Sequence, residues 1–245
     1  SPARPIRPEA ALADIEQLQR RSKDLDDWHM PLMNWWALEA QAETGSDRIL
    51  RRRGDPEIWN LPMVRQHIAA RLMQRYAMAG GPENLATAVN LLDLAPDEDV
   101  RQELLVGLNR AFQGTTMPEL PEELSNALAE YQESVGSSPL VLKFRQGDES
   151  VLGEAIKALG SSGTALVARI ELAKALGETG SPKALPPLLK LITDSEYALQ
   201  RVGMRSAGRF DDPSVAQRIL GAYNSRIVNE HDVRGTANRV LASRA

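Results

Sequence analysis

The sequence predicts an all-α fold built from repeated pairs of helices. Of the 245 residues, 32 are leucine and 31 are alanine, whereas valine, isoleucine and threonine number 13, 10 and 8. Leucine and alanine are strong helix formers, and the β-branched and aromatic residues that a sheet needs are scarce. The second observation is a recurrent arginine, which marks one helix in every 32 to 36 residues.

Five segments align when their arginines are superposed. The arginines are Arg65, Arg101, Arg169, Arg201 and Arg234, spaced by 36, 68, 32 and 33 residues, and the interval of 68 equals two units of 34. One unit, near residue 135, has lost its arginine. The residues three and seven positions after each arginine are mostly apolar, so they form one face of a helix.

A second set of helices alternates with the first. Three of them begin alike, with Pro82, Pro182 or Pro213 at the first helical position, and the next aligned arginine follows 19, 19 and 21 residues later. Ser181 and Asp212 precede two of these prolines and are good N-cap residues. The unit is therefore a pair of helices in roughly 33 residues, a length typical of tetratricopeptide and HEAT-like arrays.

The motifs favour HEAT-like repeats. The ladder of Trp or Leu, Gly and Tyr expected of a tetratricopeptide does not recur, although that class stays open as the alternative. The segments 99–101 and 232–234, both Asp-Val-Arg, resemble the start of the second helix of a HEAT repeat, and Pro186-Pro187 resembles the kink common in its first helix. We therefore expect a right-handed α-solenoid of HEAT/ARM-like helical pairs. An arginine at this position can pair with an acid of the adjacent repeat, and stacked copies would form a ladder of such contacts.

The elements follow in order along one predicted domain. We expect an extended segment over residues 1–10 and a single solenoid domain over 11–245, with helices at 11–18, 31–42, 48–53, 121–133, 140–145 and 229–243 besides the repeats that start at residue 60. The chain does not begin with Met, and its last predicted helix keeps an apolar face without a polar cap repeat. Both features indicate a piece of a longer protein.

The composition argues against chemistry within these residues. The chain has no cysteine, which excludes disulfides, a thiol nucleophile and Cys-ligated metals. No run of 18 apolar residues and no glycine-rich phosphate-binding motif occurs, and His29, His67 and His231 are far apart. We expect no catalytic residue, no cofactor, no metal ion and no membrane-spanning segment, and therefore no enzyme.

Tryptophans and arginines near the N-terminus are the candidate partner-binding residues. The set is Trp28, Trp35, Trp36, Trp59, Arg52 and Arg53. Tryptophan is enriched at interface hot spots, so one ring of the adjacent pair 35–36 could face outward, whereas packing of both rings in the core is the alternative. The basic run 48–53 beside aromatics is also typical of nucleic-acid binding. Acidic neighbours and a pI of about 5.5 favour a solvated, ion-paired helix instead.

One segment resembles a specific family. The run 26–39, Asp-Asp-Trp-His-Met followed by Pro-Leu-Met-Asn-Trp-Trp-Ala-Leu-Glu, resembles the opening of the helical middle region of very large multidomain proteins typical of planctomycetes. Residues 64–72, 104–108, Gly114 and 241–244 are further matches. In that family, a β-propeller resembling quinoprotein sugar dehydrogenases precedes HEAT-like repeats, and a c-type cytochrome domain follows them. The resemblance implies a scaffold in a membrane-bound dehydrogenase family, exported to the periplasm or the cell surface, and it carries over no catalytic residue.

The leading functional hypothesis is a non-enzymatic helical-repeat scaffold that positions protein partners or neighbouring domains of the same polypeptide. A HEAT-like nucleic-acid-binding module, related in architecture to helical-repeat DNA glycosylases, is one alternative, although it would need a basic groove on an acidic chain. A regulatory or lyase-like partner of a cofactor-carrying protein is the other.

Overall fold

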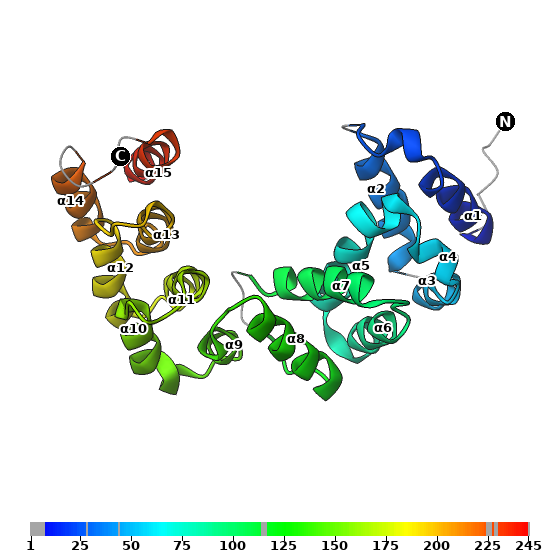
Figure 1. Cartoon of the computed structure of the whole chain (residues 1–245), viewed down its shortest axis with the longest axis horizontal. Helices are drawn as coiled ribbons and strands as arrows, with labels where there is room; N and C mark the ends of the chain where they lie inside the picture. The colour runs from blue at the N-terminus through cyan, green and yellow to red at the C-terminus, as the bar shows by residue number, and fades with distance from the viewer. Residues whose placement is uncertain are drawn as a thin grey trace. The chain divides into compact units, whose positions relative to one another are not determined.

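The chain folds into two compact helical units, as the computed structural model in Figure 1 shows. The structure describes residues 8–27, 29–43, 45–113, 117–223, 227 and 230–244. Unit 1 comprises Ser1–Gln113 and Pro118–Tyr131, and unit 2 comprises Gly114–Met117 and Gln132–Ala245. The single domain expected over residues 11–245 stays a prediction.

Every regular element in the described ranges is a helix, which confirms the all-α prediction. Unit 1 contains α1 (Pro8–Gln19), η1 (Ser22–Asp24), α2 (Met30–Ala42), α3 (Ser46–Arg53), α4 (Pro56–Trp59), the π-helical turn η2 (Val64–Ile68), α5 (Ala69–Ala79), α6 (Gly81–Asp93), α7 (Glu98–Ala111) and most of α8 (Glu122–Ser134). Unit 2 contains α9 (Pro139–Arg145), η3 (Glu149–Val151), α10 (Leu152–Gly160), α11 (Leu166–Glu178), η4 (Pro182–Ala184), α12 (Leu185–Leu191), α13 (Tyr197–Ala207), α14 (Pro213–Ala222) and α15 (His231–Ala242). The expected helices at 11–18, 31–42, 48–53, 121–133, 140–145 and 229–243 are all present, with ends that differ by a few residues.

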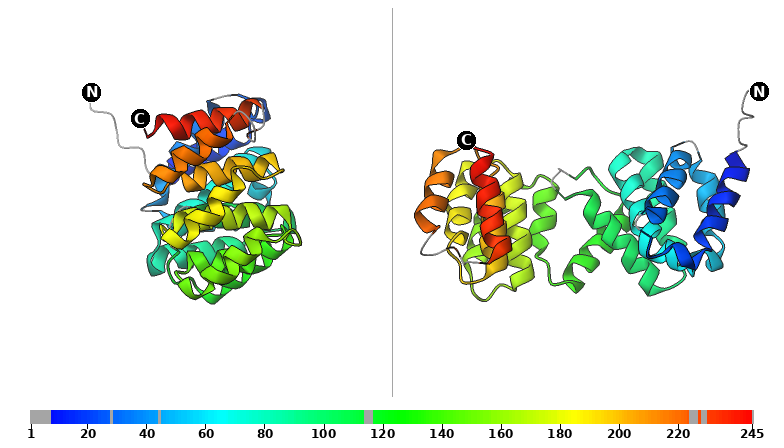
Figure 2. Two further views of the ribbon diagram at one scale, coloured as in Figure 1. Left: turned by 90° about the vertical axis from the view of Figure 1, so that its left-hand side faces the viewer. Right: turned by 90° about the horizontal axis from the view of Figure 1, so that it is seen from above.

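Unit 2 is built of two rows of helices. The helices that carry the aligned arginines, α11, α13 and α15, lie side by side in one row, and α10, α12 and α14 pack behind them (Figures 1 and 2). The buried leucines, valines and alanines of both rows form one continuous core, which includes Leu172, Leu188 and Val233. Each pair thus buries its apolar face against its neighbours, as expected for stacked repeats.

Unit 1 repeats this arrangement. The helices α2, α5 and α7 follow one another in a row, α3 and α6 pack beside them, and α1 packs on α2. The closest approach is between α5 and α7, where a Cβ atom added to Gly107 would lie 2.0 Å from the carbonyl oxygen of Ala70. Gly107 therefore allows two helix backbones to touch.

The predicted ladder of ion pairs is present at three of the aligned arginines. Arg65 reaches Asp97 at 2.5 Å, Arg169 reaches Asp194 at 3.0 Å and Arg201 reaches Asp232 at 3.4 Å. Each acid lies at the start of the next arginine-bearing helix or, for Asp194, in the turn just before it, as the spacing of the repeats requires.

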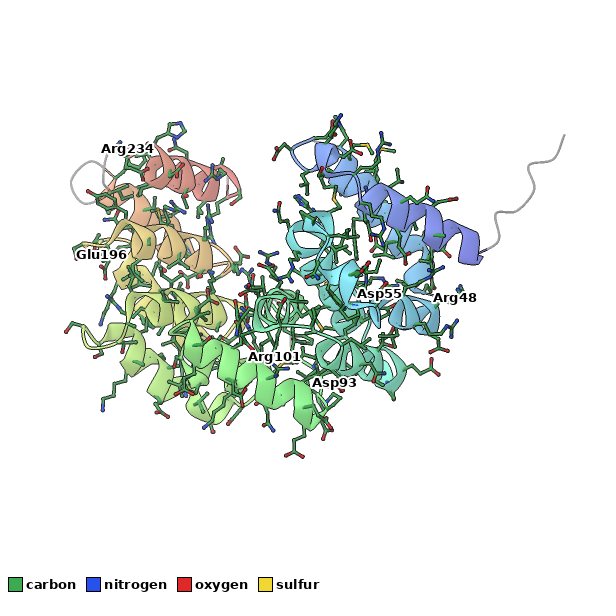
Figure 3. All side chains as sticks on the ribbon, turned by 45° about the vertical axis from the view of Figure 1, so that its right-hand side comes forward. Arg48, Asp55, Asp93, Arg101, Glu196 and Arg234 are labelled. Carbon is green, nitrogen blue, oxygen red and sulfur yellow. The ribbon has the colours of Figure 1, made fainter. Side chains whose placement is uncertain are left out.

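Arg234 is bonded differently from these three arginines. Arg234, labelled in Figure 3, belongs to α15. It lies over the ring of Tyr223, with its guanidinium carbon 4.6 Å from the ring centroid, and it donates a hydrogen bond to the Tyr223 carbonyl oxygen at 3.3 Å. Four of the five aligned arginines thus tie neighbouring helices together, by an ion pair or by a cation–π contact.

Capping residues begin several of the helices as the sequence predicts. Pro213 is the first residue of α14, and the Asp212 carboxylate accepts a hydrogen bond from the Ser214 N–H at 2.8 Å. Ser181 precedes η4 but forms no capping hydrogen bond with its side chain. At the start of α6, Gly80 and Gly81 have φ values of 62° and 73°, which an L-residue rarely adopts, so the turn between α5 and α6 depends on glycine.

Candidate functional site

The two adjacent tryptophans of α2 point to different sides of the helix. The Trp35 side chain is 9% exposed and belongs to the core, whereas Trp36 is 58% exposed. Successive residues of an α-helix are about 100° apart, so a buried face can hold one ring while the next ring faces solvent. Trp36, rather than Trp35, is therefore the ring that faces outward.

Trp36 lies on one wall of a groove of about 470 Å³ between α2 and α5. Each wall consists of residues that follow the i, i+3, i+4, i+7 spacing of a single helix face. The lining residues are Leu32, Trp35, Trp36 and Glu39 from α2, and Arg71, Gln74, Arg75, Met78 and Ala79 from α5. We call this feature the α2/α5 groove. Its rim is apolar as well as charged, because Met78 is 62% exposed.

The charges of the α2/α5 groove are unbalanced. Arg75 lies 3.8 Å from the Glu39 carboxylate, measured from Nε to Oε1, which is a long ion pair. Arg71 forms no ion pair with the described residues, and its Nη1 atom is buried without a hydrogen-bond partner there. Two arginines thus face one glutamate in a chain whose net charge is −4. The Arg71 guanidinium thus brings to the groove a positive charge that has no counter-ion among the described residues.

His67 lies one helical turn before Arg71 and feels its charge. Burial lowers the pKa of His67 below its usual value, and the nearby positive charge of Arg71 lowers it further, while the Leu25 carbonyl and Asp26 act in the opposite direction. The imidazole is therefore held in its neutral form at neutral pH, so it adds no positive charge to the groove.

The remaining candidate residues lie around α3 and α4. Trp59 is fully buried, and its Nε1 donates a hydrogen bond to the Arg53 carbonyl oxygen at 2.7 Å. The Arg53 guanidinium lies over that ring at 5.5 Å, and burial lowers its pKa to about 10 although Glu16 acts against this. Arg52 is exposed and lies 3.5 Å from the Glu16 carboxylate. Trp28 lies outside the described residues.

These positions separate the five sequence candidates that the structure describes. Of these five, Trp35 and Trp36 line the α2/α5 groove, whereas Arg52 is exposed and does not line it. Trp59 and Arg53 are interior residues that offer a partner no surface while the helices stay packed. The basic run 48–53 is therefore no continuous charged patch, because its last arginine points inward and Arg52 is paired with an acid.

Sequence reasoning missed Arg71, although the aligned repeats contain a signal for it. Six positions after the aligned arginine, the other four segments have Gly107, Ala175, Ala207 and Val240, which are all buried, whereas the first has Arg71. A charged residue at a position that is buried in the other repeats indicates two helices that do not pack tightly against each other. The arginine at position 71 therefore indicates the groove between α2 and α5.

In the ranges that the structure describes, no three His, Asp or Glu side chains gather closely enough to hold a metal ion. A second hollow, of about 700 Å³, lies between α6 and the segment 118–123, and it is lined by prolines, aliphatic residues and two glutamates. No helix among the described residues is long and apolar enough to cross a membrane.

Comparison with known proteins identifies the repeat type in the C-terminal third. Residues 165–242, which include almost all of α11 to α15, match a family model of HEAT repeats. The match supports the HEAT-like prediction for this region, and HEAT repeats are generally non-enzymatic scaffolds for protein interaction. No curated protein and no solved structure matches the chain. The structure and the family model together establish an all-helical chain with a HEAT-like repeat region over residues 165–242.

Proposed function

We propose that this chain is a non-enzymatic scaffold, a right-handed HEAT-like α-solenoid that binds a segment of a protein partner in the α2/α5 groove. The observation that carries the proposal is the exposure of Trp36 on the wall of a groove that also presents Met78. Exposed tryptophan and methionine beside a hollow are costly in water and typical of interaction sites. The absence of a suggested catalytic set among the sequence motifs supports the non-enzymatic part.

A selection with displayed random peptides tests this function. The full chain serves as bait, and each recovered peptide is then measured against W36A and against Y197A. Tyr197 is a matched control, because it is an exposed aromatic residue at the start of α13, in unit 2, and does not line the groove. We expect the peptides to lose about tenfold or more in affinity for W36A and to bind Y197A as they bind the parent chain. Recovery of no peptide, or of peptides that bind W36A normally, would refute a docking role of this groove.

We further propose that the partner is a neighbouring domain of a larger exported protein. The family resemblance at residues 26–39 supports this, since it implies a dehydrogenase-like propeller before the helical region and a c-type cytochrome after it. The flanking sequence of the parent gene product tests the proposal. A propeller on the N-terminal side and a C-x-x-C-H motif on the C-terminal side would support it, and different flanking domains would overturn it. Localisation in the periplasm or at the cell surface belongs to the same proposal, and cell fractionation tests it.

A further inference from the structure

The shape of the α2/α5 groove fits a helix. Its two walls run in the same direction. Near their C-terminal ends, Tyr76 of α5 donates a hydrogen bond to the Ala42 carbonyl oxygen at the end of α2. Near their N-terminal ends, Leu25 and Asp26, which precede α2, lie close to His67, which precedes α5. The walls span eight residues of α2 and nine residues of α5, which is about 12 Å of helix at 1.5 Å per residue. A partly apolar groove between two helices is a usual seat of an amphipathic helix, which fills it with its own residues at i, i+3, i+4 and i+7.

The apolar part of the groove sets the first requirement on an occupant. Trp36 and Met78 are more than half exposed, and Met33 is exposed one turn before Trp36 on the same helix. The thioether and indole groups adapt to aliphatic and aromatic side chains of a partner. An occupant therefore needs large apolar residues along one face.

The charged part sets the second requirement. Arg71 has no ion-pair partner among the described residues, and Arg75 meets only the distant carboxylate of Glu39, so the groove carries one excess positive charge. A guanidinium binds a carboxylate through two parallel hydrogen bonds, an interaction that an uncharged amide reproduces poorly. A lysine at the same place in an occupant would meet two arginines.

We propose that the α2/α5 groove binds an acidic amphipathic helix of a protein partner, whose apolar face covers Trp36 and Met78 and whose Asp or Glu carboxylate pairs with Arg71. This inference rests on the proposed function and deepens it by naming the chemistry of the bound segment. The excess positive charge of the groove, in a chain of net charge −4, selects the acid.

A library of synthetic 16-residue helices tests the inference. Leu and Phe are fixed at i, i+4 and i+7, and the positions between them hold Glu, Gln or Lys. The full chain selects from this library, and binding of individual labelled peptides is measured by fluorescence anisotropy. We expect Glu-containing peptides to dominate, to bind about tenfold more tightly than their Gln counterparts, and to weaken as salt is added.

The variants assign the effect to the groove. R71Q should weaken the Glu peptides about tenfold and leave the Gln peptides unchanged. R205Q is the matched control, because Arg205 is an exposed arginine of α13 in unit 2, and it should change neither. Equal binding of Glu and Lys peptides, no binding of any Glu peptide, or an unchanged affinity of R71Q would overturn the acidic occupant.

The two proposals fail in different ways. If the random-peptide selection yields ligands that depend on Trp36 but carry no acid, the acidic helix is wrong and the docking groove stands. If no ligand of either library depends on Trp36, the docking function itself is wrong.

Discussion

The packing of α11 against α13 offers a sharp test of the stacked-repeat architecture. Gly177 lies near the end of α11, where a Cβ atom would stand 2.6 Å from the Ser206 Cβ and 2.9 Å from the Ser206 Cα. Carbon atoms in contact are about 3.5–4.0 Å apart. The substitution G177A therefore forces the two helices apart by about 1 Å or distorts one of them.

The expected magnitude follows from two opposing terms. Overpacking a close helix contact costs about 1–3 kcal/mol, whereas replacing glycine by alanine within a helix recovers about 0.5–1 kcal/mol. G177A should thus lower the free energy of unfolding of unit 2 by about 1–2 kcal/mol. Gly153 of α10 is the matched control in the same unit, since its added Cβ would meet nothing within 4 Å. G153A should stabilise unit 2 by up to about 1 kcal/mol.

Hydrogen exchange in α11 and α13, followed across a urea series, measures both effects in the correct unit. This is preferable to one global transition, because two units need not unfold together. S206G removes one of the two crowded carbons, so G177A should cost less in the S206G background by about 1 kcal/mol. The reasoning is refuted if G177A stabilises the unit as G153A does, or if its cost is the same in both backgrounds.

Three further outcomes are expected from the charged residues of unit 1. Hydrogen bonds from Arg65 and from the Val100 N–H hold the pKa of Asp97 below its usual value. The stability that Asp97 contributes is therefore present above its unfolded-state pKa and lost as pH falls through its folded-state pKa. D97N should flatten the acid limb of a stability–pH curve measured by urea denaturation. Acid should also destabilise the chain through His67. Because its pKa is lower in the folded chain, the unfolded chain takes up a proton more readily as pH falls through the ordinary His value. Stability should therefore fall from pH 7.5 to pH 5.5, and the same slope in H67Q would contradict this. R53M should leave the free energy of unfolding unchanged or raise it, because burial disfavours the charged guanidinium and its Nη1 has no partner among the described residues. A decrease in the free energy of unfolding of about 3 kcal/mol or more would indicate instead that Arg53 forms a paired buried charge.

The repeat was predictable from sequence because its signals are periodic. The aligned arginines and the prolines at helix starts recur in phase, so they place both rows of helices and the ion pairs from Arg65, Arg169 and Arg201. The side that each tryptophan faces was not predictable, because two adjacent large residues fit a wide buried stripe in either order. The burial of Arg53 was hidden for a related reason, since a long side chain at the end of a basic run can turn inward over an aromatic ring such as Trp59. The π-helical turn at Val64–Ile68 has no compositional signal.

The location of the groove follows from one position of the repeat. The sixth residue after the aligned arginine faces the preceding helix of the row, as Gly107 of α7 shows by its approach to Ala70 of α5. Glycine there brings α5 and α7 into backbone contact, whereas the equivalent Arg71 of α5 places a guanidinium between α5 and α2. The two helices cannot close over a long charged side chain, so a hollow remains beside Trp36. The residue that opens the groove is therefore the same residue that gives it an unpaired positive charge, and a partner helix that fills the hollow must also supply the acid.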